Sequence, residues 1–253
     1  MSVSVPNILR TKLTPPATYA DGILRHRLVN QIKSNLDRPL VLVCAPAGYG
    51  KSTLIVDWLA ADAGQASDVV WYSLDEDDND PARFFTYIIL ALQDITATDE
   101  LLSLVLSPQP PPPKTICTIL LNHFENLENR LVFVFDDYHL ITSPAIHEAM
   151  IFMLEHQPPQ VNVIVTSRED PPFPLSRWRV RGQLGEIRAD DLRFTPEEST
   201  SFLSDMLGIR LSDEQMLNLN TRTEGWIAGL QLAALAMKGR DDVANFIAAF
   251  TGS

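Results

Sequence analysis

Residues 45–53 read APAGYGKST and have the composition of a loop that surrounds a phosphate group. Gly48 and Gly50 allow the backbone to turn so that successive N–H groups point at one anion, and a following helix would add its N-terminal dipole. In the pattern G-x-x-x-x-G-K followed by Ser or Thr, the lysine reaches the β- and γ-phosphates and the hydroxyl binds Mg²⁺. Lys51 and Ser52 stand at these two positions.

The loop also has the neighbours that a phosphate-binding loop requires. Residues 39–45 (PLVLVCA) form an apolar run typical of a strand buried on both faces, and a helix is expected over 51–61. The full pattern has glycine where this chain has Ala45, but that glycine is the one least involved in contact with phosphate. The residues expected to contact the nucleotide are Pro46, Ala47, Gly48, Tyr49, Gly50, Lys51, Ser52 and Thr53.

A second apolar run, 131–137 (LVFVFDD), ends in two acids. A strand that delivers a carboxylate at its C-terminal end fits a Walker B element, in which Asp136 would hold Mg²⁺ opposite Ser52. Asp137 could then polarise an attacking water as general base. The alternative is that the two carboxylates only form a helix cap and turn.

Arg168 closes a third apolar strand, 161–167, within the sequence TSR. An arginine at the C-terminal end of such a strand faces the crevice in which α/β proteins bind ligands. Arg168 could therefore sense the γ-phosphate and stabilise charge that develops on it. Its structural alternative is an ion pair with Asp136 or Asp137.

Strands alternate with helices along most of the chain, which predicts an α/β fold with a parallel sheet covered on both faces. From Thr195 the pattern becomes helical. Residues 195–198 (TPEE) form a capping box with proline in the first turn, and 212–215 (SDEQ) repeat the cap. We expect a segment 1–38 leading into the fold, a P-loop nucleotide domain 39–194 and a helical subdomain 195–253. The end after DDVANFIAAF is abrupt, which suggests that more protein follows.

Composition narrows the function classes. The net charge of −12 argues against a nucleic-acid binder, because such binding relies on Lys and Arg at phosphates. No apolar run approaches the length of a membrane span, and no signal peptide is apparent, so the cytoplasm is the expected location. In 176–182 (SRWRVRG) three arginines alternate and would share one face of a strand, where we expect solvation.

Two further groups of polar residues are not expected to bind a metal ion. The acidic stretch 75–80 (DEDDND) lacks the spacing of a calcium loop and its terminal bidentate glutamate, so a solvated loop is expected. The five histidines show no metal-ligand spacing, and surface or cap roles suffice for them.

In order along the chain, the motifs are RTKL and RHRLV, APAGYGKST, WYSLDEDDNDPARFFTYI, LVFVFDDYHLI, VIVTSREDPP, RVRGQL to DLRFTPEE, and TEGWIAGLQLAAL. Together they resemble the N-terminal ATPase domain of the MalT-type large LuxR-family transcriptional activators, of the STAND class of signal-transduction ATPases. The resemblance covers about Arg10 to Met237. WYSLDEDDND and DDYHLI are much more specific than the phosphate loop.

The resemblance implies an AAA-like (ASCE) P-loop sheet with strand order 5-1-4-3-2 and a bound adenine nucleotide, ATP or ADP, with Mg²⁺. It implies a slow ATPase in which Lys51, Asp137 and Arg168 are catalytic. The segment that begins with Arg25 and Arg27 would lie against adenine, and GWIAGL would close the helical subdomain over the nucleotide. ADP would hold a closed form and ATP an open, self-associating one. DNA would be bound only by a C-terminal domain that is absent here.

Two other functions share the same loop. A small-molecule kinase would add a mobile arginine-rich lid, for which the cluster 177–181 is the only candidate. A non-catalytic nucleotide-binding interaction module is the other alternative, although Lys51, Asp136 and Asp137 are all intact.

Overall fold

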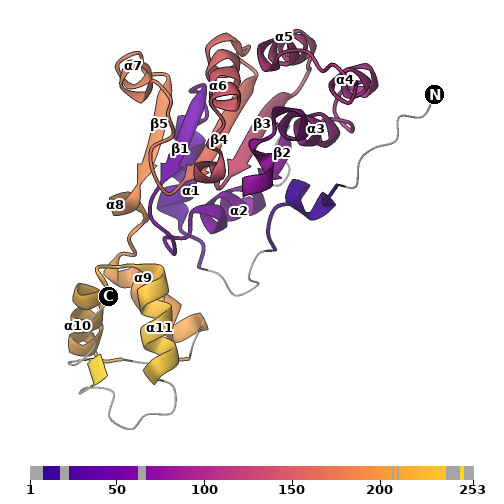
Figure 1. Ribbon diagram of the computed structural model, residues 1–253. Helices are drawn as coiled ribbons and strands as arrows, with labels where there is room; N and C mark the ends of the chain where they lie inside the picture. The colour runs from indigo at the N-terminus through magenta and orange to yellow at the C-terminus, as the bar shows by residue number, and fades with distance from the viewer. Residues whose placement is uncertain are drawn as a thin grey trace.

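A five-stranded parallel sheet forms the centre of the protein (Figure 1). The computed structural model describes residues 8–17, 23–61, 67–206, 208–209, 211–237 and 246–247. The strands are β1 (Leu40–Cys44), β2 (Ser67–Ser73), β3 (Arg130–Asp136), β4 (Val161–Ser167) and β5 (Leu184–Arg188). Their spatial order is β2-β3-β4-β1-β5, which confirms the expected order 5-1-4-3-2.

Helices cover both faces of the sheet, as the continuous apolar strands predict. One face packs against α1 and α2, and the other against α3 to α7 (Figure 1). The bounds are α1 (His26–Asn35), α2 (Lys51–Ala61), α3 (Pro81–Ala91), α4 (Asp99–Val105), α5 (Pro113–Phe124), α6 (Pro144–His156) and α7 (Leu175–Val180). Alternate residues of each strand therefore enter two different hydrophobic cores.

The strand order brings the loops of interest together. β1 lies between β4 and β5, and β3 lies between β2 and β4, all parallel. At the C-terminal edge, the Ala45 amide donates to the Ser167 carbonyl at 3.2 Å, and the Leu74 amide donates to the Asp136 carbonyl at 3.0 Å. The segments that follow β1, β3 and β4 thus leave the sheet side by side.

A smaller all-helical part follows β5. It contains α8 (Ala189–Leu192), α9 (Pro196–Ser201), the π-helical turn η4 (Phe202–Met206), α10 (Asp213–Thr223) and α11 (Ile227–Met237). The capping boxes expected at Thr195 and Ser212 are both formed. A separate hydrophobic core of this part includes Phe194, and the expected boundary between 194 and 195 stays a prediction. Of the expected helical stretch 241–250, all but 246–247 lies outside the described residues.

The arginine-rich stretch 176–182 is not a strand, so that expectation was wrong. Residues Leu175–Val180 form the short helix α7, and Gly182 ends it with φ of 69°. Arg179 pairs with Glu186 on β5 at 2.6 Å. Alternating arginines over six residues cannot distinguish a strand from a helix, because the segment is too short. No helix in the described part of the chain combines the length and apolarity that crossing a membrane requires.

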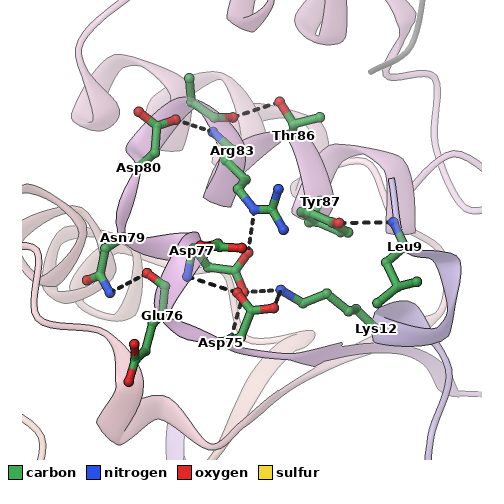
Figure 2. A network of polar contacts seen from close by, with 12 residues as sticks. Leu9, Lys12, Asp75, Glu76, Asp77, Asn79, Asp80, Arg83, Thr86 and Tyr87 are labelled. Atoms are coloured by element: carbon green, nitrogen blue, oxygen red, sulfur yellow. Dashed lines mark hydrogen bonds and ion pairs between the residues drawn. The ribbon is translucent and has the colours of Figure 1, made fainter. Parts of the chain in front are cut away.

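The acidic stretch 75–80 is also not simply solvated (Figure 2). It forms a 3₁₀ turn, η2 (Glu76–Asn79), whose capping box is made by Asp75 and Asp78. The Asp78 side chain is fully buried and accepts bonds from Lys12 and Arg83. Lys12 comes from another 3₁₀ turn, η1 (Arg10–Leu13), and its ammonium also lies 4.9 Å from the centre of the Tyr87 ring. The N-terminal segment is therefore fastened beside edge strand β2.

Replacing Lys12 should destabilise the fold. In Lys12→Met, the buried Asp78 carboxylate would keep only Arg83 as a cationic partner, and removal of one partner from a buried ion pair costs about 3 kcal/mol or more. Urea unfolding followed by circular dichroism would measure the loss. The matched control is Lys114→Met, which removes an exposed pair with Glu148 and should change stability by less than about 0.5 kcal/mol. Equal effects of the two substitutions would contradict the structural role of Lys12.

Candidate functional site

The loop between β1 and α2 has the backbone that its glycines predict. Gly48 and Gly50 have φ of 77° and 74°, a region that side chains other than glycine rarely adopt. Lys51 begins α2 and is buried, and its ammonium donates to the Ala45 and Pro46 carbonyls at 2.9 and 3.1 Å. The lysine therefore closes the loop on itself and places a buried cation beneath it.

Burial lowers the pKa of Lys51, and the charge of Arg168 acts in the same direction. Asp137 and Asp136 act in the opposite direction and favour the charged amine. The two acids at the end of β3 and the arginine after β4, predicted from two separate motifs, therefore lie within electrostatic range of Lys51. An anion bound in the loop would add a further partner for the ammonium group.

Asp136 is the most constrained acid of the site. Its side chain is buried, and its Oδ1 accepts bonds from the Ser52 hydroxyl at 2.8 Å and the Thr166 hydroxyl at 2.5 Å. Burial raises the pKa of Asp136, while the two hydroxyl bonds oppose that shift. The contact between Ser52 and Asp136 joins the loop after β1 to the end of β3.

This pair of oxygen ligands fits Mg²⁺. Magnesium prefers oxygen ligands and usually takes only one or two from the protein, with phosphate oxygens and water completing the octahedron. In the described part of the chain, no group of three or more His, Cys, Asp or Glu side chains could hold a metal ion. Ser52 and Asp136 would thus hold the ion together with a nucleotide, not as a protein cage.

Asp137 adopts an unusual backbone conformation for a residue other than glycine, with φ of 60°. Its amide donates to Thr166 Oγ1 at 2.9 Å, and its own carbonyl accepts from the Leu140 amide at 3.1 Å. Its carboxylate is 41% exposed and is therefore accessible to water. The alternative of a helix cap is not formed by this side chain, because Asp137 precedes the 3₁₀ turn η3 (Tyr138–Leu140) without a side-chain cap bond.

His139 lies at the site, although only a surface or cap role was expected for it. Its Nδ1 lies 3.8 Å from Asp137 Oδ1, and neither ring nitrogen has a hydrogen-bond partner among the described residues. Burial lowers the pKa of His139; Asp137 raises it, and Arg168 and Lys51 lower it further. The sequence signal was its place two residues after Asp137, inside the motif DDYHLI.

Arg168 follows β4 and has an exposed side chain. Within the described residues no ion pair joins it to Asp136 or Asp137, so the structural alternative for this arginine is not formed. Its charge lowers the pKa of both Lys51 and His139, which places it close to these two groups. The guanidinium is thus free to meet a ligand.

The helical subdomain touches the loop directly. The Trp226 indole donates to the Ala47 carbonyl and the Ala228 amide donates to the Gly48 carbonyl, both at 3.3 Å. A Cβ added to Gly48 would lie 2.7 Å from that of Ala228. The stretch GWIAGL therefore packs on the loop, as the resemblance implied.

Arg25 and Arg27 act in a way that the sequence did not predict. Arg25 is buried, donates to the Leu192 carbonyl at 2.9 Å and lies over the Phe194 ring. Burial lowers the pKa of Arg25 to about 10. Arg27 forms a two-pronged pair with Glu198, both bonds at 3.0 Å. Both side chains thus bind the connection to the helical subdomain, and their contact with adenine stays a prediction.

The other predicted residues divide into two groups. Pro46, Ala47 and Thr53 are exposed at the mouth of the loop, where a phosphate or base could reach them. Tyr49 is half-buried and packs against the core beneath α1 and α2. The aromatic ring therefore anchors the loop to the fold.

Comparison with known proteins agrees with this geometry. No protein-family model matches the chain. It is 37% identical over 233 residues to the HTH-type transcriptional regulator MalT of Yersinia enterocolitica, and 38% identical over 233 residues to those of Serratia proteamaculans and Yersinia pestis. The chain is a homologue of the N-terminal part of MalT. Each match covers 91% of this chain but only 25% of the relative, so the chain spans about a quarter of their length.

Solved structures show the same fold. A Walker-type ATPase of Pyrococcus abyssi aligns with a TM-score of 0.59 and 14% identity, covering 92% of this chain and 73% of that one. Cdc6p from Pyrobaculum aerophilum aligns with a TM-score of 0.54 and 15% identity, covering 91% and 66%. The fold of this chain is thus that of the P-loop ATPases.

Asp136→Asn should separate stability from metal binding. The amide oxygen can still accept both hydroxyl bonds, but the buried charge is gone. Because burial raises the pKa of Asp136, the ionised acid destabilises the nucleotide-free protein, so the variant should resist urea better at about pH 7.5. The gain should vanish as pH falls towards about 3.9, the ordinary pKa of aspartate, where both states of the wild type bind the proton.

The same variant should bind ATP more weakly in the presence of Mg²⁺. The expected loss is about tenfold or more, because a bond to a charged group contributes roughly 1.5–3 kcal/mol. Titration calorimetry with and without Mg²⁺ would measure it. A variant that is less stable at neutral pH, or that binds Mg-ATP normally, would contradict the assignment of Asp136.

Proposed function

We propose that this chain is a regulatory ATPase domain that binds ATP or ADP with Mg²⁺ and hydrolyses ATP slowly. The observation that carries the proposal is the contact of Ser52 with Asp136 beside the buried ammonium of Lys51. These three groups come from two separate motifs, and each has the chemistry that a phosphate chain with a bound metal requires. The homology to MalT and the fold of P-loop ATPases support the same conclusion.

The roles in hydrolysis follow from position and exposure. Lys51 would contact the β- and γ-phosphates, and Arg168 would meet the γ-phosphate from the end of β4. Ser52 and Asp136 would hold a Mg²⁺ ion, which would supply positive charge to the phosphate groups. Asp137, with its accessible carboxylate, would take a proton from the attacking water as the water oxygen bonds to the γ-phosphorus. The bond from that phosphorus to the bridging oxygen breaks, and ADP leaves.

The output would be a change in the helical subdomain. Ala47 and Gly48 use their carbonyls to hold Trp226 and Ala228, so the loop that contacts phosphate also positions α11. In a closed ADP form this contact would persist, and ATP with an inducer would favour an open form that self-associates. DNA binding would belong to a C-terminal region like that of the HTH-type relatives.

A kinase function finds less support. It would need a mobile arginine lid, and the only cluster suggested by the sequence is anchored by acids. Arg177 pairs with Glu155, and Arg179 forms a two-pronged pair with Glu186. The hydrogen bonds from Arg179, and to a smaller extent those from Arg188, lower the pKa of Glu186 to about 2. Glu186 and Arg179 therefore both stay charged at neutral pH.

Asp137→Ala should stop hydrolysis and leave binding intact. Removing a general base costs about a hundredfold or more in kcat, whereas Lys51, Ser52 and Asp136 remain to hold the nucleotide. The test measures phosphate release at saturating ATP and the affinity for ATP by calorimetry. The matched variant is Lys51→Ala, which should weaken binding of both nucleotides by about tenfold or more.

Two results would overturn these roles. Normal turnover in Asp137→Ala would remove Asp137 as the base. Absence of both ATP binding and turnover in the wild-type chain would reject the ATPase proposal itself, and a phosphorylated small-molecule product would favour the kinase.

Arg168→Ala should reduce the preference for ATP over ADP. If the guanidinium meets the γ-phosphate, the variant loses a contact that ADP cannot make, worth roughly 1.5–3 kcal/mol or about tenfold in the affinity ratio. The control is Arg181→Ala, an exposed arginine at the end of α7. The same affinity ratio in wild type and Arg168→Ala would show that Arg168 does not sense the γ-phosphate.

A further inference from the structure

The acidic motif 75–80 has no role in the proposed chemistry, yet it is built as tightly as the site itself. Its core is the buried Asp78, which accepts hydrogen bonds from Lys12 and Arg83. Asp78 also accepts the Asp75 amide at 2.8 Å and so closes the capping box of η2. These bonds fix the position of the next residue, Asn79.

Asn79 uses its whole amide group on two segments of the chain. Its Nδ2 donates to the Glu76 carbonyl at 3.0 Å and to the Leu140 carbonyl at 2.9 Å. Its Oδ1 accepts from the Thr142 amide at 2.6 Å, the Thr142 hydroxyl at 3.2 Å and the Ser143 amide at 2.9 Å. One half-buried side chain thus connects the turn after β2 to the segment after β3.

That segment is the one that begins with Asp137 and contains His139. The Leu140 amide donates to the Asp137 carbonyl, and the Leu140 carbonyl accepts from Asn79. Leu140 therefore links Asn79 to Asp137, the proposed general base. Thr166 supports the other end through the Asp137 amide, and Tyr138 contacts His147 Nδ1 at 3.0 Å. The turn is therefore held from three sides.

The conformation of Asp137 requires such support. A residue other than glycine with φ of 60° stores strain and persists only when its surroundings determine it. Without Asn79, the Leu140 carbonyl and the Thr142 and Ser143 amides would lose their partner, and the turn could relax. Asp137 and His139 would then move relative to Lys51.

We infer that Asn79 is a positioning residue for the nucleotide site, which keeps Asp137 in place by holding the turn that follows it. The bonds of Asp78 with Lys12 and Arg83 stabilise the turn that carries Asn79. This inference rests on the proposed hydrolysis, because its consequence is a slower chemical step. Binding of the nucleotide, which depends on the loop after β1, is not affected.

The test compares Asn79→Ala, Asn79→Asp and the wild-type chain. Asn79→Ala should lower kcat for ATP hydrolysis about tenfold or more, since small displacements of catalytic groups cost up to about a hundredfold, while KM stays within about threefold. Asn79→Asp keeps the acceptor for Thr142 and Ser143 but loses both donated bonds, so its kcat should be intermediate. The control is Asn126→Ala, which removes one exposed bond to a helix carbonyl and should leave kcat unchanged.

Amide hydrogen exchange gives a second readout that does not need turnover. In Asn79→Ala the Thr142 and Ser143 amides should exchange faster, while residues in β1 and α2 keep the wild-type rates. Normal kcat in Asn79→Ala would overturn the inference. A fall in kcat that comes with a higher KM and a lower stability would overturn it too, because it would indicate general damage to the fold. If the wild-type chain has no turnover, the hydrolysis proposal fails, and unchanged exchange at Thr142 and Ser143 would then reject the inference separately.

Discussion

The contact that organises this protein is the pair of hydroxyl bonds to the buried carboxylate of Asp136. One hydroxyl comes from Ser52 at the start of α2, and the other from Thr166 at the end of β4. A charged acid in this position is unfavourable, as its raised pKa indicates, and nothing in the packing of the core requires it. Its bonds join the ends of β3 and β4 to the start of α2, and a metal ion bound there would find two oxygen ligands already side by side.

The phosphate loop carries a second constraint. Its carbonyls at Ala47 and Gly48 face the helical subdomain, while the ammonium of Lys51 binds the carbonyls at the start of the loop. Gly48 has no room for a side chain on the face that meets Ala228. The shape of the loop and the position of α11 are thus linked through backbone atoms. Arg25 and Arg27 add a connection from the start of α1 to residues 191–198.

Much of this architecture could be predicted from sequence because its signals are local. Apolar runs that end in charged or glycine-rich turns predicted the strands, and the motif around Lys51 predicted the loop and the helix that follows it. The capping boxes at Thr195 and Ser212 were visible within four residues each. The short helix α7 was misjudged for the same reason, since alternating arginines over six residues fit a strand as well as a helix.

The parts that the sequence could not predict depend on partners far away along the chain. Asp78 looked solvated because acids in a run usually are, but its partners include Lys12, 66 residues earlier. Asn79 bonds Leu140, Thr142 and Ser143, which lie 61 to 64 residues later. Buried polar groups are normally hydrogen-bonded. A polar residue of a loop can therefore take a structural role when distant segments supply its hydrogen-bond partners. The acidic motif is specific for this reason: the side chains of Asp78 and Asn79 are bonded to distant segments, and exchanging Asp78 would leave the buried ammonium of Lys12 without its closest partner.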